Sequence, residues 1–311
     1  MPNSLKIYLS SIPGQQFSQE TIQSPLLEGI RCNTAVPTPS LKVKILKNFQ
    51  GVIFPIKGWV DLKTRELRIT KEAKAPYDYL ELNHNIEVNT PTPMYYNEGK
   101  NVVIVKQVFD GNKLIIKPPD NYTGKEIINF GKGASVNIPD NSLKIEGYLT
   151  QNDIEYIEAA NHIGLHNYLL SFVESIEDIN ELLKLDPNAN IIAKIESKKG
   201  LEFVLNDFEQ VKNSVRLLVA RADLYIELDR PHEILKALRL IIEKDPNAIA
   251  ASRILESFIN LERIPRCADF TDLGFLLEIG YKTLLLGDDL CQNEEVLLSA
   301  LGFLNLMNTQ I

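Results

Sequence analysis

The residues of this chain best suited to chemistry are Lys194 and Glu196, near the end of the apolar stretch "NIIAKIES". Alternate residues of a strand share a face, so these opposite charges point the same way from a strand that is otherwise apolar enough to be buried. A salt-bridged strand end would explain an isolated pair. The next apolar run, "VRLLVARADLYIEL", ends in the same manner with Arg221 and Asp223, and this repetition favours a functional site.

Glu196 and Asp223 are two carboxylates expected at the ends of neighbouring strands. Mg²⁺ typically takes one or two protein carboxylates and leaves its other positions to water and substrate oxygens. Lys194 beside such an ion could stabilise a developing oxyanion or carry a proton. Together the three residues predict a magnesium site for enolate chemistry.

The elements that must position these residues alternate regularly from about residue 148. Amphipathic helices alternate there with five short apolar runs, which is typical of a parallel sheet. Three more strands are predicted near the N-terminus, at "LKIYLSS", "EGIRCN" and "GVIFPI". We therefore predict an α/β fold, a (β/α)₈ TIM barrel formed by residues 1–58 and 147–311. The β-rich residues 59–146 are predicted to be a small β-barrel-like domain inserted after the third strand. Active sites of this fold lie at the carboxyl ends of the strands.

The composition limits the class of partner. The 311 residues are 44% hydrophobic and 24% charged, with a net charge of −8, which is typical of a globular protein and disfavours nucleic acid or anionic membranes as partners. The three cysteines have neither disulfide nor zinc spacing, and no apolar run approaches the ~18 residues of a membrane span. We expect a cytoplasmic protein that acts on a small molecule.

Six segments resemble the pyruvate kinase family in order and spacing. "AKIES", "LLVARADL", "AIAASRILES" and "IPRCADFTDLG" are similar to its catalytic strands, and "EGIRCN" is similar to its second strand. "NFGKGASVNIP", followed by "LTQND", resembles the return from its inserted domain to the barrel. The resemblance is good over about 147–290, patchy over 1–57 and weak in the insert. It implies a glycolytic kinase that transfers a phosphoryl group from phosphoenolpyruvate to ADP.

The resemblance also implies roles for the metal-site residues. It makes Lys194 the lysine at the transferring phosphoryl group and enolate oxygen, and it makes Glu196 and Asp223 the ligands of Mg²⁺ or Mn²⁺. The backbone around Ala222 and Asp223 would hold the substrate carboxylate. The family has glycine at the position of Ala222, so the added methyl group is expected to narrow that pocket.

Four further residues match family positions. Ser252 matches the threonine near the enolate carbon, and Arg31 matches a phosphate-binding arginine. Asn33 matches an asparagine of the monovalent-cation site, and Lys132 matches a lysine near the nucleotide end of the cleft.

The family's third strand ends in Asp-Thr-Lys-Gly-Pro-Glu-Ile-Arg, and two alignments to it are open. The first, on "GVIFPIKG", preserves Lys57 and Gly58 and loses the acidic, hydroxyl and arginine positions. The second, on "DLKTRELR", lacks a preceding apolar run but preserves Asp61, Lys63, Glu66 and Arg68. We favour the first, because a buried strand needs an apolar run. On this alignment the K⁺ site and a second phosphate-binding arginine are lost.

Other departures concern closure and regulation. The insert lacks the Asp-Asp-Gly segment that closes over the substrate in the family, Glu174 stands where the family usually has a basic residue, and its final-strand Ser-Gly-Glu motif reads here as "LGDD", residues 286–289. Nothing after about residue 308 corresponds to the family's regulatory C-terminal domain, so any oligomer is expected to form without one.

Three functions are compatible with these observations. The first is a pyruvate-kinase-like phosphotransferase. The second is a magnesium-dependent lyase, decarboxylase or other non-kinase enzyme acting on a pyruvate-type acid through an enolate. The third is a catalytically degenerate binding or regulatory protein. Retention of Lys194, Glu196 and Asp223 favours an enzyme, and the kinase is the leading hypothesis.

Overall fold

The computed structural model describes residues 5–36, 38–117, 127–259 and 264–308. Within them, eight parallel strands close into a barrel in the order β1-β2-β3-β13-β14-β15-β16-β17. The strands are β1 (Lys6–Ser11), β2 (Leu27–Asn33), β3 (Lys57–Leu62), β13 (Asn167–Leu170), β14 (Asn190–Ile195), β15 (Val215–Ala220), β16 (Ile249–Ala251) and β17 (Thr283–Leu285). The predicted α/β barrel fold is confirmed.

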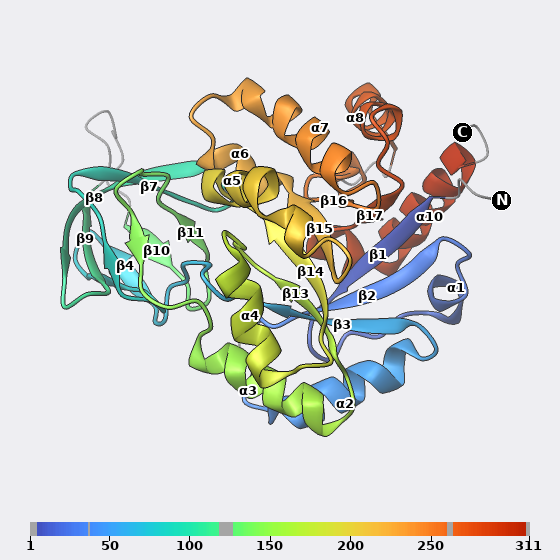
Figure 1. Ribbon diagram of the computed structural model, residues 1–311, viewed down its shortest axis with the longest axis horizontal. Helices are drawn as coiled ribbons and strands as arrows, with labels where there is room; N and C mark the ends of the chain where they lie inside the picture. Colours follow the sequence, from blue (N-terminus) through green and yellow to red (C-terminus); the bar gives the residue numbers. More distant parts are fainter. Residues whose placement is uncertain (1–4, 37, 118–126, 260–263, 309–311) are drawn as a thin grey trace.

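Helices follow the strands and surround the barrel (Figure 1). They are α1 (Gln19–Ile22), α2 (Lys42–Ile53), α3 (Gln151–His162), α4 (Ile176–Leu185), α5 (Lys198–Asn206), α6 (Arg221–Glu227), α7 (Ile234–Lys244), α8 (Cys267–Glu278), α9 (Asp288–Cys291) and α10 (Glu294–Asn308), with 3₁₀ turns η1 (Phe208–Gln210), η2 (Pro231–Glu233) and η3 (Glu256–Ile259). Helices α3 and α4 begin with capping boxes, in which a hydroxyl and a carboxylate satisfy the first free amides. None of the helices among the described residues has the length and apolar character needed to cross a bilayer.

Alternate residues of the barrel strands serve two separate cores. One set faces the helices and joins a large apolar cluster, as Ile191 and Ala193 of β14 do. The other set fills the barrel interior with Tyr8, Trp59, Leu169, Ile192, Leu218, Ala220, Ile249, Ala251 and Leu285. The alternation along each strand therefore decides which side chains face the interior and reach the mouth of the barrel.

The structure corrects the predicted third strand. "GVIF" continues α2, which buries Ile45, Phe49 and Ile53 on one helical face, and the barrel strand begins only at Lys57. β3 pairs with β13 through Leu62, opposite Leu170, so the expected boundary at residue 58 falls inside this strand. The alignment on "DLKTRELR" is therefore the one that the fold supports.

We call residues 66–146 the insert. Its described residues form short strands. These are β4 (Ala73–Ala75), β5 (Leu80–Glu81), β6 (Ile86–Glu87), β7 (Thr92–Tyr96), β8 (Asn101–Phe109), β9 (Lys113–Lys117), β10 (Ile128–Phe130), β11 (Val136–Asn137) and β12 (Lys144–Ile145). An apolar cluster of their own, including Met94, Val103 and Leu114, is separate from the barrel cores. The insert lies to one side of the barrel, with β11 beside α6 (Figure 1).

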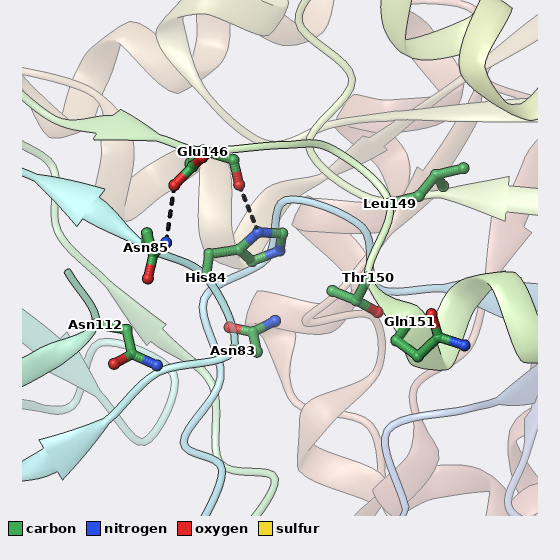
Figure 2. A pocket seen from close by; sticks show the side chains of 8 residues that line it. All are labelled: Asn83, His84, Asn85, Asn112, Glu146, Leu149, Thr150 and Gln151. Carbon is green, nitrogen blue, oxygen red and sulfur yellow. Dashed lines mark hydrogen bonds between the residues drawn. The ribbon is translucent and has the colours of Figure 1, made fainter. Parts of the chain in front are cut away.

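The chain passes between barrel and insert at residues 63–65 and again at 146–150. His84 of the insert lies between the two crossings, with its Nε2 2.6 Å from the Thr64 carbonyl oxygen. Its Nδ1 lies 3.1 Å from the carbonyl oxygen of Glu146 (Figure 2). Asp153 of α3 accepts hydrogen bonds from the backbone amides of Lys63 and Thr64 at 2.8 and 3.1 Å. A polar cavity of about 290 Å³ adjoins His84. Side chains from both parts therefore hold the crossings together.

Candidate active site

The inward face of two barrel strands changes from apolar to charged toward the carboxyl end. On β14, Ile192 packs in the barrel interior and Lys194 follows it on the same face. On β3, Trp59 packs in the interior and Asp61 follows it. Because alternate strand residues share a face, Lys194 and Asp61 both point into the barrel mouth.

Asp61 is the fully buried centre of this site. Its Oδ2 lies 2.9 Å from Arg31 Nε and is bonded by Lys63 Nζ, and its Oδ1 lies 3.6 Å from Lys194 Nζ. Burial alone would raise the pKa of Asp61, but the three cations together hold it well below its usual range. Asp61 is thus an anion that fixes three cations in one place.

Lys194 connects this anion to Glu196. Its Nζ lies 3.1 Å from Glu196 Oε1 and donates to Ser171 Oγ at 2.9 Å. Burial opposes the charge of Lys194, yet Asp61 and Glu196 raise its pKa above the usual range. The predicted pair at the strand end is therefore a real contact, and it faces the mouth.

Glu196 is also held by the turn that follows the neighbouring strand β13. Its Oε2 accepts a hydrogen bond from the Phe172 amide at 2.7 Å, and Phe172 has a left-handed φ of 46°. Burial, together with repulsion from Asp223 and Glu66, outweighs Lys194 and raises the pKa of Glu196 to about 7. The site contains more buried negative charge here than its nearby cation neutralises.

Glu66 and Arg68, at the start of the insert, add a second ion pair. Arg68 Nη2 lies 2.7 Å from Glu66 Oε1, and Arg68 Nη1 donates to the Gly133 carbonyl. Within the described residues, Glu66 Oε2 and Arg68 Nε are buried without a hydrogen-bond partner. Such groups are costly unless something else binds them, so this pair favours a ligand between barrel and insert.

The predicted strand end at Arg221 and Asp223 is wrong in its geometry, because β15 ends at Ala220 and α6 begins at once. The guanidinium of Arg221 turns to Asp272, at 2.6 Å, and to the Ser252 carbonyl. Asp223 instead lies one helical turn before Glu227, and the Asn137 amide of the insert donates to both carboxylates at 3.3 Å. Asp223 still belongs to the site, on a helix and not on a strand.

Arg31 and Asn33 meet a further acid that follows β17. Asn33 Nδ2 donates to Asp288 Oδ2 at 2.7 Å, and Arg31 Nη2 lies 3.5 Å from the same oxygen. Ser10 Oγ donates to Asp288 Oδ1. Asp288 is the first acid of "LGDD", and it contacts Arg31 in addition to Asp61.

The other predicted residues lie outside these contacts. Ser252 follows β16 with a left-handed φ of 68°, and its carbonyl is held by Arg221. Ala222 lies in the first turn of α6. Lys132 is exposed, next to Gly133 whose carbonyl binds Arg68. The structure does not bring Ser252, Ala222 or Lys132 into the charged cluster around Asp61.

The donor set at the mouth fits a divalent cation held by two protein groups. Burial raises the pKa of both carboxyl groups, Glu196 and Asp223. Repulsion from Asp223 raises the pKa of Glu196 further, repulsion from Glu66 raises that of Asp223, and a divalent cation would relieve this repulsion. Over the described ranges, no group of three or more His, Cys, Asp or Glu side chains could enclose a metal. Mg²⁺ with two protein carboxylates and further substrate or water oxygens matches these donors.

Sequence reasoning assigned no role to several residues that the fold brings to the site: Asp61, Lys63, Glu66, Arg68, Asn137 and Asp288. The first four were visible in the second alignment of the third strand. The signal that would have selected it is the spacing of Ile45, Phe49 and Ile53, which has the period of a helix and leaves "GVIF" no strand to form.

A family model described as "Pyruvate kinase, barrel domain" matches residues 56–287, which is most of the chain and begins just before β3. No curated protein matches the chain.

Proposed function

Because this chain belongs to the pyruvate kinase family, we propose that it transfers the phosphoryl group of phosphoenolpyruvate to a nucleoside diphosphate such as ADP. The observation that carries this proposal is the buried charge cluster at the barrel mouth, where Lys194 lies between Glu196, at 3.1 Å, and Asp61, at 3.6 Å. Phosphoryl transfer depends on fixed charges placed around a polyanion. A closed cluster of cations and carboxylates supplies them.

The chain's own residues account for most of the steps. Arg31 and Arg68 are two guanidinium groups suited to phosphate oxygens. As the phosphorus–oxygen bond to the enol breaks and a bond to the nucleotide forms, the Lys194 ammonium stabilises the enolate oxygen that is left. The enolate then takes a proton at its methylene carbon to give pyruvate, and we assign delivery of that proton to the Ser252 hydroxyl.

Glu196 and Asp223 would hold Mg²⁺ or Mn²⁺. When bound, the ion supplies positive charge that polarises and neutralises substrate oxygens. The first-turn amides of α6, at Ala222 and Asp223, have no intrahelical acceptors and suit the substrate carboxylate. Asp61 is already neutralised by Arg31, Lys63 and Lys194, so we expect turnover without K⁺.

The corrected third strand changes the balance between the candidate functions. Non-kinase enolate chemistry was favoured by the loss of the cation site and of the closing segment. The acidic position of that cation site is present as Asp61, which pairs with Arg31, and Arg68 is present as well. Several buried charges in one place reduce the stability of a protein, and they are typical of functional sites. This concentration disfavours a catalytically degenerate protein. The kinase is therefore the function that the site supports best.

The proposal is tested by a coupled assay for pyruvate from phosphoenolpyruvate, with ADP and Mg²⁺, with and without K⁺. Calorimetry of oxalate binding with Mg²⁺ separates the alternatives, because binding without turnover would select enolate chemistry of another kind. Glu196→Gln is expected to abolish Mg²⁺-dependent binding, whereas Glu202→Gln, on α5, is the matched control. Absence of both turnover and binding in the unaltered protein would exclude the kinase and the enolate alternative together.

A further inference from the structure

A turn of the insert touches the barrel beside Ser252. Residues 97–100 join β7 to β8, and Asn97, Glu98 and Gly99 are successively left-handed, with φ of 53°, 56° and 79°. The Glu98 carbonyl accepts a hydrogen bond from Arg253 Nη2 at 3.0 Å. A Cβ on Gly99 would lie 2.8 Å from both Cγ1 and Cδ1 of Ile226 in α6, and the left-handed φ of this residue favours glycine. The turn therefore packs directly on the barrel.

The barrel side of this contact is a firmly held loop. Arg253 follows Ser252, and both residues are left-handed, with φ of 54° and 68°. Their carbonyls each accept a hydrogen bond from Arg221 Nη2, at 3.0 and 2.8 Å, and Asp272 holds Arg221 in turn. Arg253 also lies 5.8 Å from the centre of the Tyr225 ring. A movement of Arg253 would thus be felt at Ser252.

The remaining contacts between insert and barrel support one closed arrangement. Asn137 of β11 bonds Asp223 and Glu227 of α6, and Lys198 of α5 donates to Asn141 at 2.8 Å. The two places where the chain itself passes between barrel and insert lie elsewhere, at residues 63–65 and 146–150. His84 bonds to a carbonyl oxygen at each of them, and Figure 2 shows its contact with Glu146. The insert is therefore tied at its crossings by the chain itself and at the turn 97–100 only by noncovalent contacts.

We infer that the turn 97–100 is a latch, which holds the insert closed over the barrel mouth and couples closure to the loop that carries Ser252. Arg253 is the positioning residue of this latch. A single hydrogen bond to an exposed arginine, with one glycine contact, shifts a closed-to-open ratio by only about two- to tenfold, so the latch can open and reclose. This inference concerns how the insert is held and does not depend on the proposed reaction.

Hydrogen exchange of the full chain, without substrate, tests the coupling. Arg253→Ala is expected to increase exchange about two- to tenfold in peptides covering 97–101 and 252–256 together. Arg253→Lys should restore part of the protection, since one donor remains. Arg239→Ala, an exposed arginine of α7, is the matched control and should change neither peptide. Unchanged exchange in both peptides after Arg253→Ala, or a change in only one, would overturn the latch.

Disulfide trapping provides a second measurement that does not require removing Arg253. Gly99→Cys with Ile226→Cys, in a Cys267→Ser background, places two Cβ atoms within the usual range for a disulfide. Mild oxidation should form an intramolecular bond in the whole population, and more slowly when Arg253→Ala is added. Failure to cross-link under conditions that oxidise a small dithiol would contradict the closed latch. Because this experiment needs no substrate, its failure is distinguishable from failure of the proposed function.

Discussion

At the scale of single residues, the distinguishing feature is a set of buried charged side chains that contact and neutralise one another. Asp61 is fully buried yet contacts Arg31, Lys63 and Lys194, and Lys194 is shared with Glu196. Buried ion pairs contribute little to stability compared with apolar packing, and their concentration in a cleft is typical of functional sites. Lys194 and Glu196 could be predicted from their strand-end spacing, because one short segment contains both.

Replacing Lys194 tests this arrangement. Lys194→Met keeps the length of the side chain but removes the charge that faces the enolate oxygen, so turnover should fall by at least about 100-fold. The coupled pyruvate assay measures it. Lys212→Met, on an exposed loop with its own partner Glu209, is the control and should retain activity. Turnover within a factor of three of that of the unaltered protein would contradict a catalytic role for Lys194.

Arg68 matches the family's arginine only in the second alignment of the third strand, so its role in binding tests that alignment. Its guanidinium has a buried Nε without a hydrogen-bond partner among the described residues, and phosphate oxygens are suitable acceptors. Arg68→Gln should weaken phosphoenolpyruvate binding about 10- to 100-fold and leave pyruvate or oxalate binding nearly unchanged. Calorimetry with each ligand measures the difference. Equal weakening of all three ligands would contradict a phosphate-binding role.

At the scale of elements, the strands that are plain apolar runs could be predicted, and two junctions could not. The apolar "GVIF" is the end of α2, where Ile53 is buried and Phe54 is exposed after the helix, while β3 itself carries Asp61. α6 begins immediately after Ala220, without a capping side chain or a turn residue, so "VARADL" reads like a continuing strand. Local pattern is insufficient where one element meets the next without a boundary signal.

Helix α6 gives a prediction of pH dependence. Burial, together with Asp223, raises the pKa of Glu227 to about 7, although the Asn137 amide partly offsets this. The folded protein therefore keeps a proton that the unfolded chain releases near pH 4.5, and stability falls as pH rises from there to about 7. Glu227→Gln removes that loss, so its stability should exceed that of the unaltered protein by about 1–2 kcal/mol at pH 8 and by little at pH 4.5.

Urea denaturation at pH 4.5 and pH 8, with divalent metals chelated, measures this difference. Glu202→Gln, an exposed position on α5, serves as the control. A Glu227→Gln variant that is less stable at pH 8 than at pH 4.5, relative to the unaltered protein, would contradict the assignment.

At the scale of the whole molecule, the barrel and the insert, each with its own apolar packing, are joined by two crossings and by polar contacts. Arg65 makes a bidentate bond to Asp178 of α4, at 2.6 and 2.8 Å, and lies 3.4 Å from Glu174. This pairing explains why an acidic residue is tolerated at Glu174. Contacts such as Asn137 to Asp223 join residues 86 positions apart, and no local pattern encodes them. The barrel and its insertion could be predicted, but the closed arrangement could not.

Arg65 should therefore determine how firmly the insert is attached. Arg65→Ala leaves Asp178 and Glu174 without a cationic partner in a mostly buried position, and the free energy of unfolding should fall by about 3 kcal/mol. Arg65→Lys should recover only part of this, because lysine cannot form the bidentate bond. Urea denaturation measures both. A loss below about 1 kcal/mol for Arg65→Ala would show that the crossing is held by other contacts.

The central claim, that the mouth of this barrel moves a phosphoryl group from an enol to a nucleotide, is tested most directly by phosphorus NMR. The full chain would be mixed with phosphoenolpyruvate, ADP and Mg²⁺, and the phosphorus signals followed over time. We predict that the phosphoenolpyruvate signal is replaced by the three signals of ATP, and that Lys194→Met abolishes the change. A phosphoenolpyruvate signal that persists, or one that gives inorganic phosphate in place of ATP, would contradict the account.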